Sequence, residues 1–398
     1  MQRHSINTSI NTSIDMNFDF KAVPNIHFSE GASAKLAGAV NALGFSKPFI
    51  VTDQGILRHS LLNEALASLK FAGLNYTVYS DVQTDPPEDN VISAAELARQ
   101  KGCDGVIGFG GGSSMDVAKL VAALISDEQP LQQMYGVNQI TTSRVPLIQI
   151  PTTAGTGSEA TCVSIVTTGE SSKAGVVSDI LFADTIILDP VLTLELPAHI
   201  TAATGIDAMV HTIEAFSSKR LKNPISDMLA LKALSLISSN LERAVANGSD
   251  LNARSDLLLG AMFAGQAFAN APVGAVHALA YPLGGIFHIP HGLSNSLVLP
   301  HVLRFNAPQA EHLYTQLMPV ILPTSSSAQN STAAEQLAEY FSALAKRLGL
   351  ETRLREVGVT EPSLEFLAEQ SMLQQRLLIN NPRTVSYDQA LCIYRQAF

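Results

Sequence analysis

Short apolar runs alternate with helical patterns between residues 47 and 153, and this alternation constrains the fold more than any other feature. The apolar runs, each typical of a buried strand, occupy residues 47–53, 74–82, 103–112 and 145–153. The helical patterns between them occupy residues 61–73, 90–102 and 113–127. Strands that alternate with helices predict parallel βαβ units. Because right-handed crossovers bring the carboxyl ends of such strands to one edge, we expect ligands to bind there.

The second half of the chain is almost entirely helical from about Thr201 onward. We therefore predict an α/β domain with a Rossmann-like parallel sheet over residues 19–194, followed by an all-α domain over residues 195–398. Residues 1–18 are predicted to form a disordered extension, because they repeat the tetrapeptide SINT and hold no continuous apolar segment of a secretory signal. A short pairing strand is the alternative for this extension.

Composition narrows the classes of partner. The net charge is -10 and no long basic run occurs in the 398 residues, which argues against nucleic acid as a partner. No apolar run reaches the roughly 18 to 20 residues that a membrane span requires, so we expect no membrane partner. The chain has only 3 cysteines, and they are far apart. A sparse and odd number of cysteines is typical of a reducing compartment, and we expect the cytoplasm.

A glycine-rich turn, Gly108–Ser114, joins the third apolar run to the next helical pattern. Glycines allow the backbone to approach a phosphate closely, and the N–H groups at the start of a helix favour negative charge. The turn is therefore a candidate phosphate site, although its spacing differs from GxGxxG. The alternative is a tight turn followed by a helix that Ser113 caps.

Two further segments follow predicted strands at the same edge. Asp53 ends the first apolar run, where a carboxylate can bind ribose hydroxyls and repel a 2′-phosphate. The alternative for Asp53 is a helix N-cap or an Asx turn. The loop Pro151–Glu159 is rich in small and hydroxyl side chains, and it is expected to line the same crevice.

Histidines gather in the segment Gly274–His301, which holds four of the chain's 10 histidines together with glycines and prolines. Imidazoles are common metal ligands. Asp207 and His211 are spaced i, i+4 in a helical pattern, and so lie on one face of a helix. One carboxylate and three imidazoles would form a four-ligand site for Fe(II) or Zn(II). The alternative for any single histidine is a hydrogen-bonded core residue, and we leave His288 and His301 out of the predicted ligand set.

Six ordered motifs resemble those of the iron-containing, group III alcohol dehydrogenases, and the resemblance extends from about Val23 to Phe398. The motifs are GGGSSMDVAK (110–119), PTTAGTGSEAT (151–161), DPVLT (189–193), ATGIDAMVHTIEAF (203–216), AVHALAYPLGG with PHG (275–292) and NPRTVSYDQALCIYRQAF (381–398). The resemblance implies a dinucleotide-binding α/β domain, an α domain and a site in the cleft between them.

Position by position, the resemblance also implies roles for individual residues. The metal ligands would be Asp207, His211, His277 and His291. The NAD-binding residues would be Asp53, which favours NAD over NADP, and Gly111, Gly112, Ser113, Ser114, Thr152, Thr153, Thr161 and Lys173. Phe268 would lie near the substrate pocket, and Val163 is expected near the same pocket, which suggests an apolar one.

Tyr281 departs from the pattern of many family members, which have a histidine four residues after the third metal ligand. That histidine is thought to lie near the substrate and to help proton transfer. A tyrosine with an ordinary pKa of about 10 is a poorer base near neutral pH. We expect the catalytic residues to be Tyr281 and the ligand His291, with the proton leaving through Tyr281, a ribose hydroxyl or water.

The predicted function is hydride transfer between NAD(H) and an alcohol/aldehyde or ketone pair, with Fe(II), or alternatively Zn(II), as the metal. Within the family, a hydroxyacid–oxoacid transhydrogenase or a maleylacetate reductase is the alternative. Such acidic substrates would want an Arg or Lys in the pocket, and we identify none for the pocket in the matched motifs; Arg304 and Lys219 are not placed by the sequence. A dehydroquinate-synthase-like lyase and a non-catalytic nucleotide-binding scaffold are weaker alternatives. The family also implies a homodimer.

Overall fold

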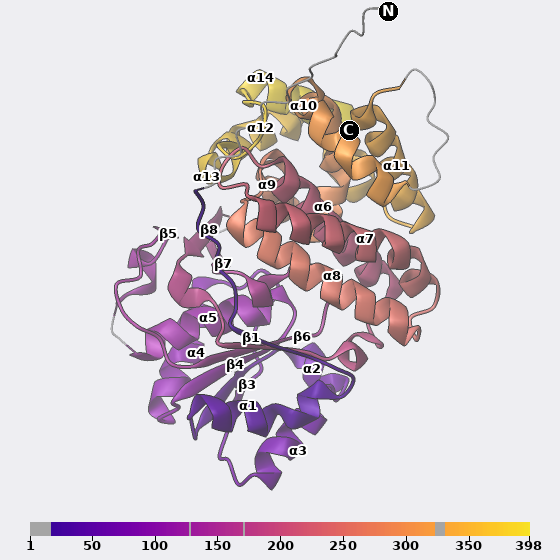
Figure 1. The fold of residues 1–398 in the computed structure, drawn as a ribbon. Coiled ribbons are helices and arrows are strands. Elements are labelled where there is room, and N and C mark those ends of the chain that lie inside the picture. Colours follow the sequence, from indigo (N-terminus) through magenta and orange to yellow (C-terminus); the bar gives the residue numbers. More distant parts are fainter. Residues whose placement is uncertain (1–16, 127–128, 170–171, 323–330) are drawn as a thin grey trace, which may run out of the picture.

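A computed structural model describes residues 17–126, 129–169, 172–322 and 331–398 of the chain (Figure 1). The predicted disordered extension, residues 1–18, lies outside the described residues except for its last two positions. Figure 1 shows a sheet with helices on both faces, formed by the first half of the chain, and a helical layer packed beside it, formed by the second half. The predicted fold class is therefore confirmed. The domain boundary at residue 194 falls between the last strand and the first long helix, and it remains a proposal.

The main sheet has six strands in the order β1-β9-β6-β4-β2-β3. Its strands are β1 (Asn25–Phe28), β2 (Pro48–Val51), β3 (Thr77–Tyr79), β4 (Gly105–Gly110), β6 (Leu147–Pro151) and β9 (Thr185–Leu188). Every neighbouring pair in this sheet is parallel, as the alternation of strands with helices predicts. The strands β2, β4, β6 and β9 are fully buried.

Helices cover both faces of this sheet, so side chains on both sides of each strand are buried. This explains why the strands have continuous apolar sequences. The helices are α1 (Leu36–Leu43), α2 (Gln54–Arg58), α3 (Asn63–Phe71), α4 (Glu88–Gln100) and α5 (Gly112–Ser126). Along β2, Ile50 packs into the apolar cluster that contains residues of α1 and α3. Phe49 and Val51 pack into the cluster that contains residues of α4 and α5. Successive side chains of a strand point to opposite faces, so both faces need apolar residues.

The order of the strands creates a crevice between β2 and β4. The chain passes from β2 to β3 on one side and later returns to place β4 on the other side. In open parallel sheets, ligands bind at the carboxyl ends of strands where the order reverses in this way. Asp53 follows β2 at this edge, and Gly110 ends β4, with Gly111 and Gly112 directly after it.

A second, three-stranded sheet has the order β5-β8-β7 and was not predicted. Its strands are β5 (Gly136–Val137), β7 (Val163–Thr168) and β8 (Ser172–Val177), with β7 and β8 antiparallel. Buried Ser164 and Val166 alternate with more exposed residues in β7, which is the period of a half-buried strand. This hairpin lies between α5 and α9 (Ala275–Phe287) and thus borders both halves of the molecule (Figure 1).

The second half is helical, and no strand follows β9 in the described part of the chain. Besides α9, its helices are α6 (Ala198–Ser217), α7 (Pro224–Ala246), α8 (Leu251–Asn270), α10 (His291–Ile321), α11 (Ala333–Arg347), α12 (Leu364–Met372), α13 (Gln375–Leu378) and α14 (Tyr387–Ala397). Helix α6 is central, since every residue from Gly205 to Ser217 is buried and α7, α8 and α10 pack around it. Unpaired polar side chains are energetically costly in a helix that is buried on all sides. The presence of Asp207, His211 and Glu214 in α6 therefore requires an explanation.

Within the described ranges, no single helix is long and apolar enough to cross a bilayer. Helices α8 and α9 meet that length and composition only as a pair bent by 109°.

Candidate metal centre and cofactor cleft

Four side chains from three helices meet beside the hairpin. Asp207 and His211 come from α6, His277 from α9, and His291 is the first residue of α10. One possible ligand atom of each residue lies within 4.8 Å of those of the other three. Asp207 Oδ1 is 3.6 Å from His291 Nε2 and 4.0 Å from both His211 Nε2 and His277 Nε2. The structure therefore brings together all four predicted metal ligands, and their role as ligands is a proposal.

Close contact between α6 and α10 places His291 in the cluster. A Cβ atom on Gly292 would lie 2.2 Å from the carbonyl oxygen of Ala203 in α6, so only glycine fits there. Pro290 is the N-cap of α10. Because proline has no backbone N–H to donate, the helix does not continue before His291. The first residue of the helix, His291, is thereby held against Asp207.

Two histidines of the cluster, His211 and His291, have lowered pKa values that favour the neutral imidazole. Burial lowers the pKa of His211 to about 3, although Asp207 acts in the opposite direction. Burial also lowers the pKa of His291. Neutral imidazole is the form that binds metal ions. Burial acts to raise the pKa of Asp207, but the neighbouring histidines and a hydrogen bond from Asn295 lower it overall, so the carboxylate is ionised.

Glu214 orients His277 from behind. Its Oε2 lies 2.6 Å from His277 Nδ1, and its Oε1 accepts a hydrogen bond of 2.7 Å from the backbone N–H of Val276. With a proton on Nδ1, the other ring nitrogen, Nε2, faces Asp207 with its lone pair available. Carboxylate–histidine pairs of this kind are usual behind metal ligands.

The cluster fits a divalent metal ion. Ligand distances of about 2.0–2.2 Å in a tetrahedral site imply separations of about 3.3–3.6 Å between ligand atoms. The three distances from Asp207 Oδ1 to the histidine Nε2 atoms, 3.6–4.0 Å, are close to this range, and all four ligand atoms lie within 4.8 Å of one another. One carboxylate and three imidazoles are acceptable to Fe(II) and Zn(II) alike.

Asn295 lies in the same cluster and was missed in the sequence. Its Nδ2 donates to Asp207 Oδ1 at 2.6 Å and lies 3.3 Å from His277 Nε2 and 3.4 Å from His291 Nε2. Its Oδ1 is buried and has no hydrogen-bond partner among the described residues. The spacing of four residues after His291 on a helix was the available signal.

Aromatic rings line the cluster. Phe268 of α8 stacks on His211, with ring centroids 4.5 Å apart. Tyr281 of α9 lies with its ring centroid 6.0 Å from that of His291. Val163, predicted near the pocket, begins β7, and its carbonyl accepts a hydrogen bond of 2.6 Å from Lys119.

The glycine-rich turn leads directly into α5, which begins at Gly112, one residue before the predicted start. Gly110 has a φ of 153°, which side chains rarely adopt. A Cβ atom on Gly112 would lie 2.9 Å from Thr156 Cγ2, so the turn and the loop 151–159 are packed together. The first turn of α5 supplies unpaired N–H groups in this crevice. Ser113 and Ser114 are the next two residues, and Ser114 is buried.

Asp53 caps a helix, which is one of the two interpretations considered for it. Its Oδ1 accepts hydrogen bonds from the N–H groups of Gly55 at 2.7 Å and Ile56 at 3.1 Å. Its Oδ2 lies 3.4 Å from Ser114 Oγ and so points toward the glycine-rich turn. Capping uses one carboxylate oxygen, and ribose recognition by the other remains a proposal.

The threonines and the lysine predicted to contact the cofactor lie around the crevice and the hairpin. The backbone N–H of Thr152 donates to Gly110 at 3.0 Å. Thr153 lies against Gly111, whose Cβ atom would be 3.6 Å from Thr153 Cγ2. Lys173 of β8 forms an ion pair of 2.6 Å with Asp85.

Buried Lys119 joins α5 to the loop and the hairpin, and the sequence analysis did not identify it as structural. Its ammonium donates to Ser158 Oγ at 2.7 Å, Thr161 Oγ1 at 3.1 Å and the carbonyl of Val163 at 2.6 Å. Asp116 lies 3.4 Å from it. A fully buried ammonium requires this many partners.

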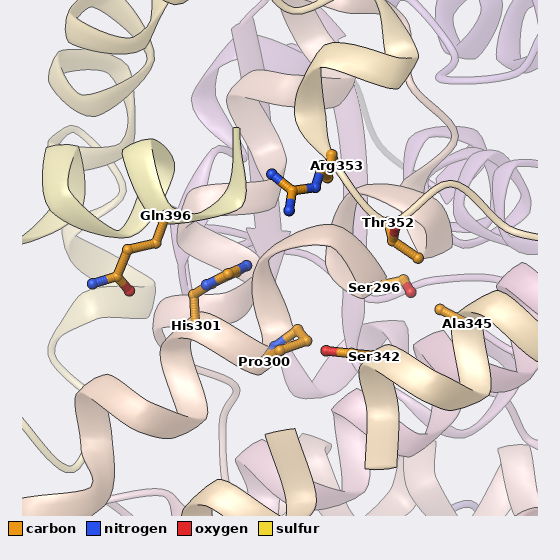
Figure 2. Close-up of a pocket in the computed structure, with 8 residues that line it drawn as sticks. All are labelled: Ser296, Pro300, His301, Ser342, Ala345, Thr352, Arg353 and Gln396. Carbon is orange, nitrogen blue, oxygen red and sulfur yellow. The ribbon is translucent and has the colours of Figure 1, made fainter. Parts of the chain in front are cut away.

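A separate cavity of about 200 Å³ lies on another face of α10 (Figure 2). Figure 2 shows the side chains of His301 and Arg353 beside this cavity, and no residue of the metal cluster lines it. Burial, Arg304 and Arg353 lower the pKa of His301 to about 4. His288, the other histidine left out of the ligand set, forms the C-cap of α9 with a φ of 54°.

A doubly wound parallel sheet with a glycine-rich crevice, next to a carboxylate–imidazole cluster on buried helices, defines a metal-dependent enzyme with a nucleotide cofactor. Comparison with known families gives the same result. Residues 24–190 match the family model described as iron-containing alcohol dehydrogenase, and residues 201–398 match that of the C-terminal part of the same family. The chain belongs to the iron-containing alcohol dehydrogenase family.

Individual relatives cover nearly the whole chain. Long-chain-alcohol dehydrogenase 1 of Geobacillus thermodenitrificans is 38% identical over 378 residues, which are 94% of this chain and 95% of that protein. The crystal structure of a 1,3-propanediol oxidoreductase has a TM-score of 0.91 at 34% identity and covers 96% of this chain and 100% of its own. A sulfoacetaldehyde reductase from Bifidobacterium kashiwanohense, solved with NAD⁺, has a TM-score of 0.83 at 29% identity and covers 96% and 99%.

Proposed function

We propose that this protein is an NAD-linked, metal-dependent oxidoreductase that interconverts alcohols with aldehydes or ketones. The observation that carries this proposal is the cluster of Asp207, His211, His277 and His291, whose geometry and protonation suit one divalent metal ion. Family membership supports the same reaction class. The related proteins include a long-chain-alcohol dehydrogenase, a 1,3-propanediol oxidoreductase and a sulfoacetaldehyde reductase, so the family leaves the substrate open.

The protein residues have distinct tasks in this reaction. A divalent metal held by the four ligands supplies Lewis acidity toward the alcohol or carbonyl oxygen, while NAD(H) supplies or accepts the hydride. Each alcohol that is oxidised gives one hydride to NAD⁺ and releases one proton. Glu214 orients His277, Asn295 holds Asp207 through a hydrogen bond, and Phe268 excludes water from one side of His211.

Tyr281 acts as a hydrogen-bond donor to the substrate oxygen in this proposal. Burial raises its pKa, and the charge of Arg376 and hydrogen bonding with Arg376 oppose that shift only in part. The hydroxyl therefore stays protonated near neutral pH and is unsuited to act as a base. Proton release to solvent then runs through a ribose hydroxyl or water, with Tyr281 Oη holding the substrate oxygen in position.

The cofactor lies across the crevice in this proposal. The turn formed by Gly111, Gly112, Ser113 and Ser114 binds the pyrophosphate, because the N–H groups at the start of α5 attract negative charge. Asp53 Oδ2 binds a ribose hydroxyl and disfavours a 2′-phosphate. Thr152, Thr153, Thr161 and Lys173 complete the cofactor site. Val163 and Phe268 form apolar walls of the substrate pocket.

A homodimer in the cytoplasm is the proposed state of the protein. Strand β1 is an edge strand, and Ile26 and Phe28 on it are 40% and 42% exposed. An exposed, apolar edge strand is prone to pair with another chain. Cys103, Cys162 and Cys392 are free thiols, as expected in a reducing compartment.

The test is an NADH absorbance assay on chelator-treated protein. Fe(II), Zn(II) or neither is restored under anaerobic conditions, and short alcohols, diols, hydroxyacids and their carbonyl forms are offered. We expect turnover only after a metal is restored. Metal contents and activities of Asp207→Ala and His277→Ala that equal those of the unmodified protein would exclude this function.

A further inference from the structure

Arg376 of the short helix α13 lies at the border between the hairpin and the helical half of the molecule. Its guanidinium lies against Gly175 of β8, where a Cβ atom would be 3.2 Å from Nη2 and 3.5 Å from Cζ. The hydroxyl group of Tyr281 is close enough for the charge of Arg376 and hydrogen bonding with it to act on the pKa of that hydroxyl. The missing side chain of Gly175 therefore leaves room for the guanidinium beside the proposed site.

Among the described residues, none forms an ion pair with Arg376. No carboxylate lies within 4.0 Å of its guanidinium in the described part of the chain, although the side chain is only partly exposed. A guanidinium offers five N–H donors in a planar fork that fits a carboxylate or a sulfonate. Its interaction with one neutral hydroxyl uses little of that capacity.

The other candidate cations are either paired with a carboxylate or exposed. Lys173 lies 2.6 Å from Asp85, and Lys119 lies 3.4 Å from Asp116. Arg304, which the sequence analysis considered as a possible anion-binding residue, forms an ion pair with Glu335 at 2.6 Å. Lys219, the other residue considered, is exposed. Arg376 is therefore the cation best placed to receive an anionic group in the cleft.

Arg376 is also close to the reacting centre. Helix α13 packs on α9, which carries Tyr281, and the Tyr281 ring centroid lies 6.0 Å from that of His291, a proposed metal ligand. Only one side chain thus separates the guanidinium from the metal cluster. A small molecule with its carbonyl oxygen at the cluster and an oxoanion a few bonds away fits this arrangement.

We propose that Arg376 binds the anionic group of the substrate, and that the preferred substrates are short aldehydes and alcohols with a carboxylate or sulfonate group. This inference rests on the proposed oxidoreductase function and names its substrate class. It favours the hydroxyacid alternative over neutral alcohols. The hydroxyacid alternative calls for a basic residue in the pocket, and Arg376 supplies it from a segment outside the family motifs.

The experiment uses matched pairs of aldehydes with the metal-loaded enzyme and NADH. Succinic semialdehyde is compared with butanal, and sulfoacetaldehyde with propanal, so that the two pairs separate carboxylate from sulfonate recognition. For Arg376→Gln, we expect KM to rise about 10- to 100-fold for the anionic member of the preferred pair, since a charge-assisted hydrogen bond is lost. The KM values for the neutral members should change less than about 2-fold. Arg376→Lys should restore part of the loss, because it keeps the charge but not the fork.

A second measurement does not depend on turnover. Binding of 4-hydroxybutanoate or of 2-hydroxyethanesulfonate to the enzyme–NADH complex is followed by calorimetry, since hydride transfer cannot occur in that complex. Arg376→Gln should weaken binding of the preferred anion by a similar factor. Arg304→Gln is the matched control, because it removes an arginine whose charge Glu335 already neutralises.

The outcomes separate the inference from the function on which it rests. Reduction of neutral aldehydes with equal or better efficiency than both anionic ones would overturn the inference and leave the oxidoreductase function intact. An equal loss on anionic and neutral substrates in Arg376→Gln would also overturn it, since that result indicates a structural role. A metal-loaded enzyme that is inactive on every alcohol and aldehyde would instead overturn the proposed function itself.

Discussion

At the scale of single residues, His277 depends on a partner that lies 63 positions away in the chain, Glu214. The carboxylate fixes the imidazole proton on Nδ1 and so leaves Nε2 for the metal. Loss of this kind of partner typically weakens metal binding by 10- to 100-fold.

Glu214→Gln is therefore expected to lower metal affinity by about 10- to 100-fold while the fold is retained. Metal content after dialysis against graded chelator concentrations measures this effect. The matched control is Glu242→Gln, because Glu242 is an exposed residue that pairs with Arg347 outside the cluster. Unchanged metal retention in Glu214→Gln would contradict the orienting role.

Glu159 links stability to pH. It is buried, and burial raises its pKa to about 7. Between its ordinary pKa of about 4.3 and pH 7, the folded protein binds a proton that the unfolded chain does not. The contribution of Glu159 to stability is therefore full below that ordinary pKa and is lost as the pH rises to about 7.

Glu159→Gln, which cannot ionise, should remove this loss. We expect the variant to gain on the order of 2–3 kcal/mol relative to the unmodified protein between pH 4.5 and 8. Urea unfolding curves at several pH values give the comparison. A constant difference between the two proteins across this range would show that Glu159 is not protonated in the folded state.

The three site residues that were not predicted from the sequence differ in how much signal the sequence held for them. Glu214 lies three residues after His211 and shares its helix face, so its position was visible in principle. Asn295 had a similar signal after His291. Arg376 had none, because it lies in no motif and reaches Tyr281 only through the packing of α13 beside α9.

At the scale of elements, long periodic helices and continuous apolar strands were predictable because their patterns are local. Helix α5 and strand β4 begin within two residues of the predicted positions. The hairpin β7–β8 was missed, because its strands are only half-buried and follow a loop rich in small residues. The hairpin packs on α5 through β7 and on α9 through β8, and no local pattern reveals such contacts.

Two elements meet with almost no space between their backbones. A Cβ atom on Gly265 of α8 would lie 2.3 Å from the carbonyl oxygen of Gly157, and one on Gly157 would lie 2.5 Å from Gly265 Cα. Gly265→Ala must therefore separate α8 from the loop. We expect a loss of about 1–3 kcal/mol of stability and a raised KM for NAD, measured by thermal unfolding and NADH kinetics.

Gly38→Ala is the matched control for that prediction. Gly38 lies within α1, and a Cβ atom there would meet nothing within 4 Å. Because alanine favours a helix over glycine, this variant should gain about 0.5–1 kcal/mol. If Gly265→Ala were as stable as Gly38→Ala, the close contact would have no energetic importance.

At the scale of the whole molecule, the exposed edge strand β1 is the surface expected to join two subunits. Ile26→Lys combined with Phe28→Lys should raise the dimer dissociation constant at least about 10-fold, since a charge on an edge strand disfavours strand pairing. Sedimentation velocity over a range of concentrations measures the change. Lys substitution at exposed Phe71, on α3, is the control for added surface charge. A dimer unaffected by the β1 variant would place the interface elsewhere.

The contact between Gly157 and Gly265 also limits how the two halves of the molecule move against each other. Backbone pressed on backbone cannot slide sideways without collision, and it has no side chain that can rearrange to absorb a shift. We therefore expect any opening of the cleft to be a rotation about this glycine pair, not a sliding movement. Lys119 of α5 also binds the loop that contains Gly157 through hydrogen bonds. The loop is therefore expected to move together with α5 as one rigid unit.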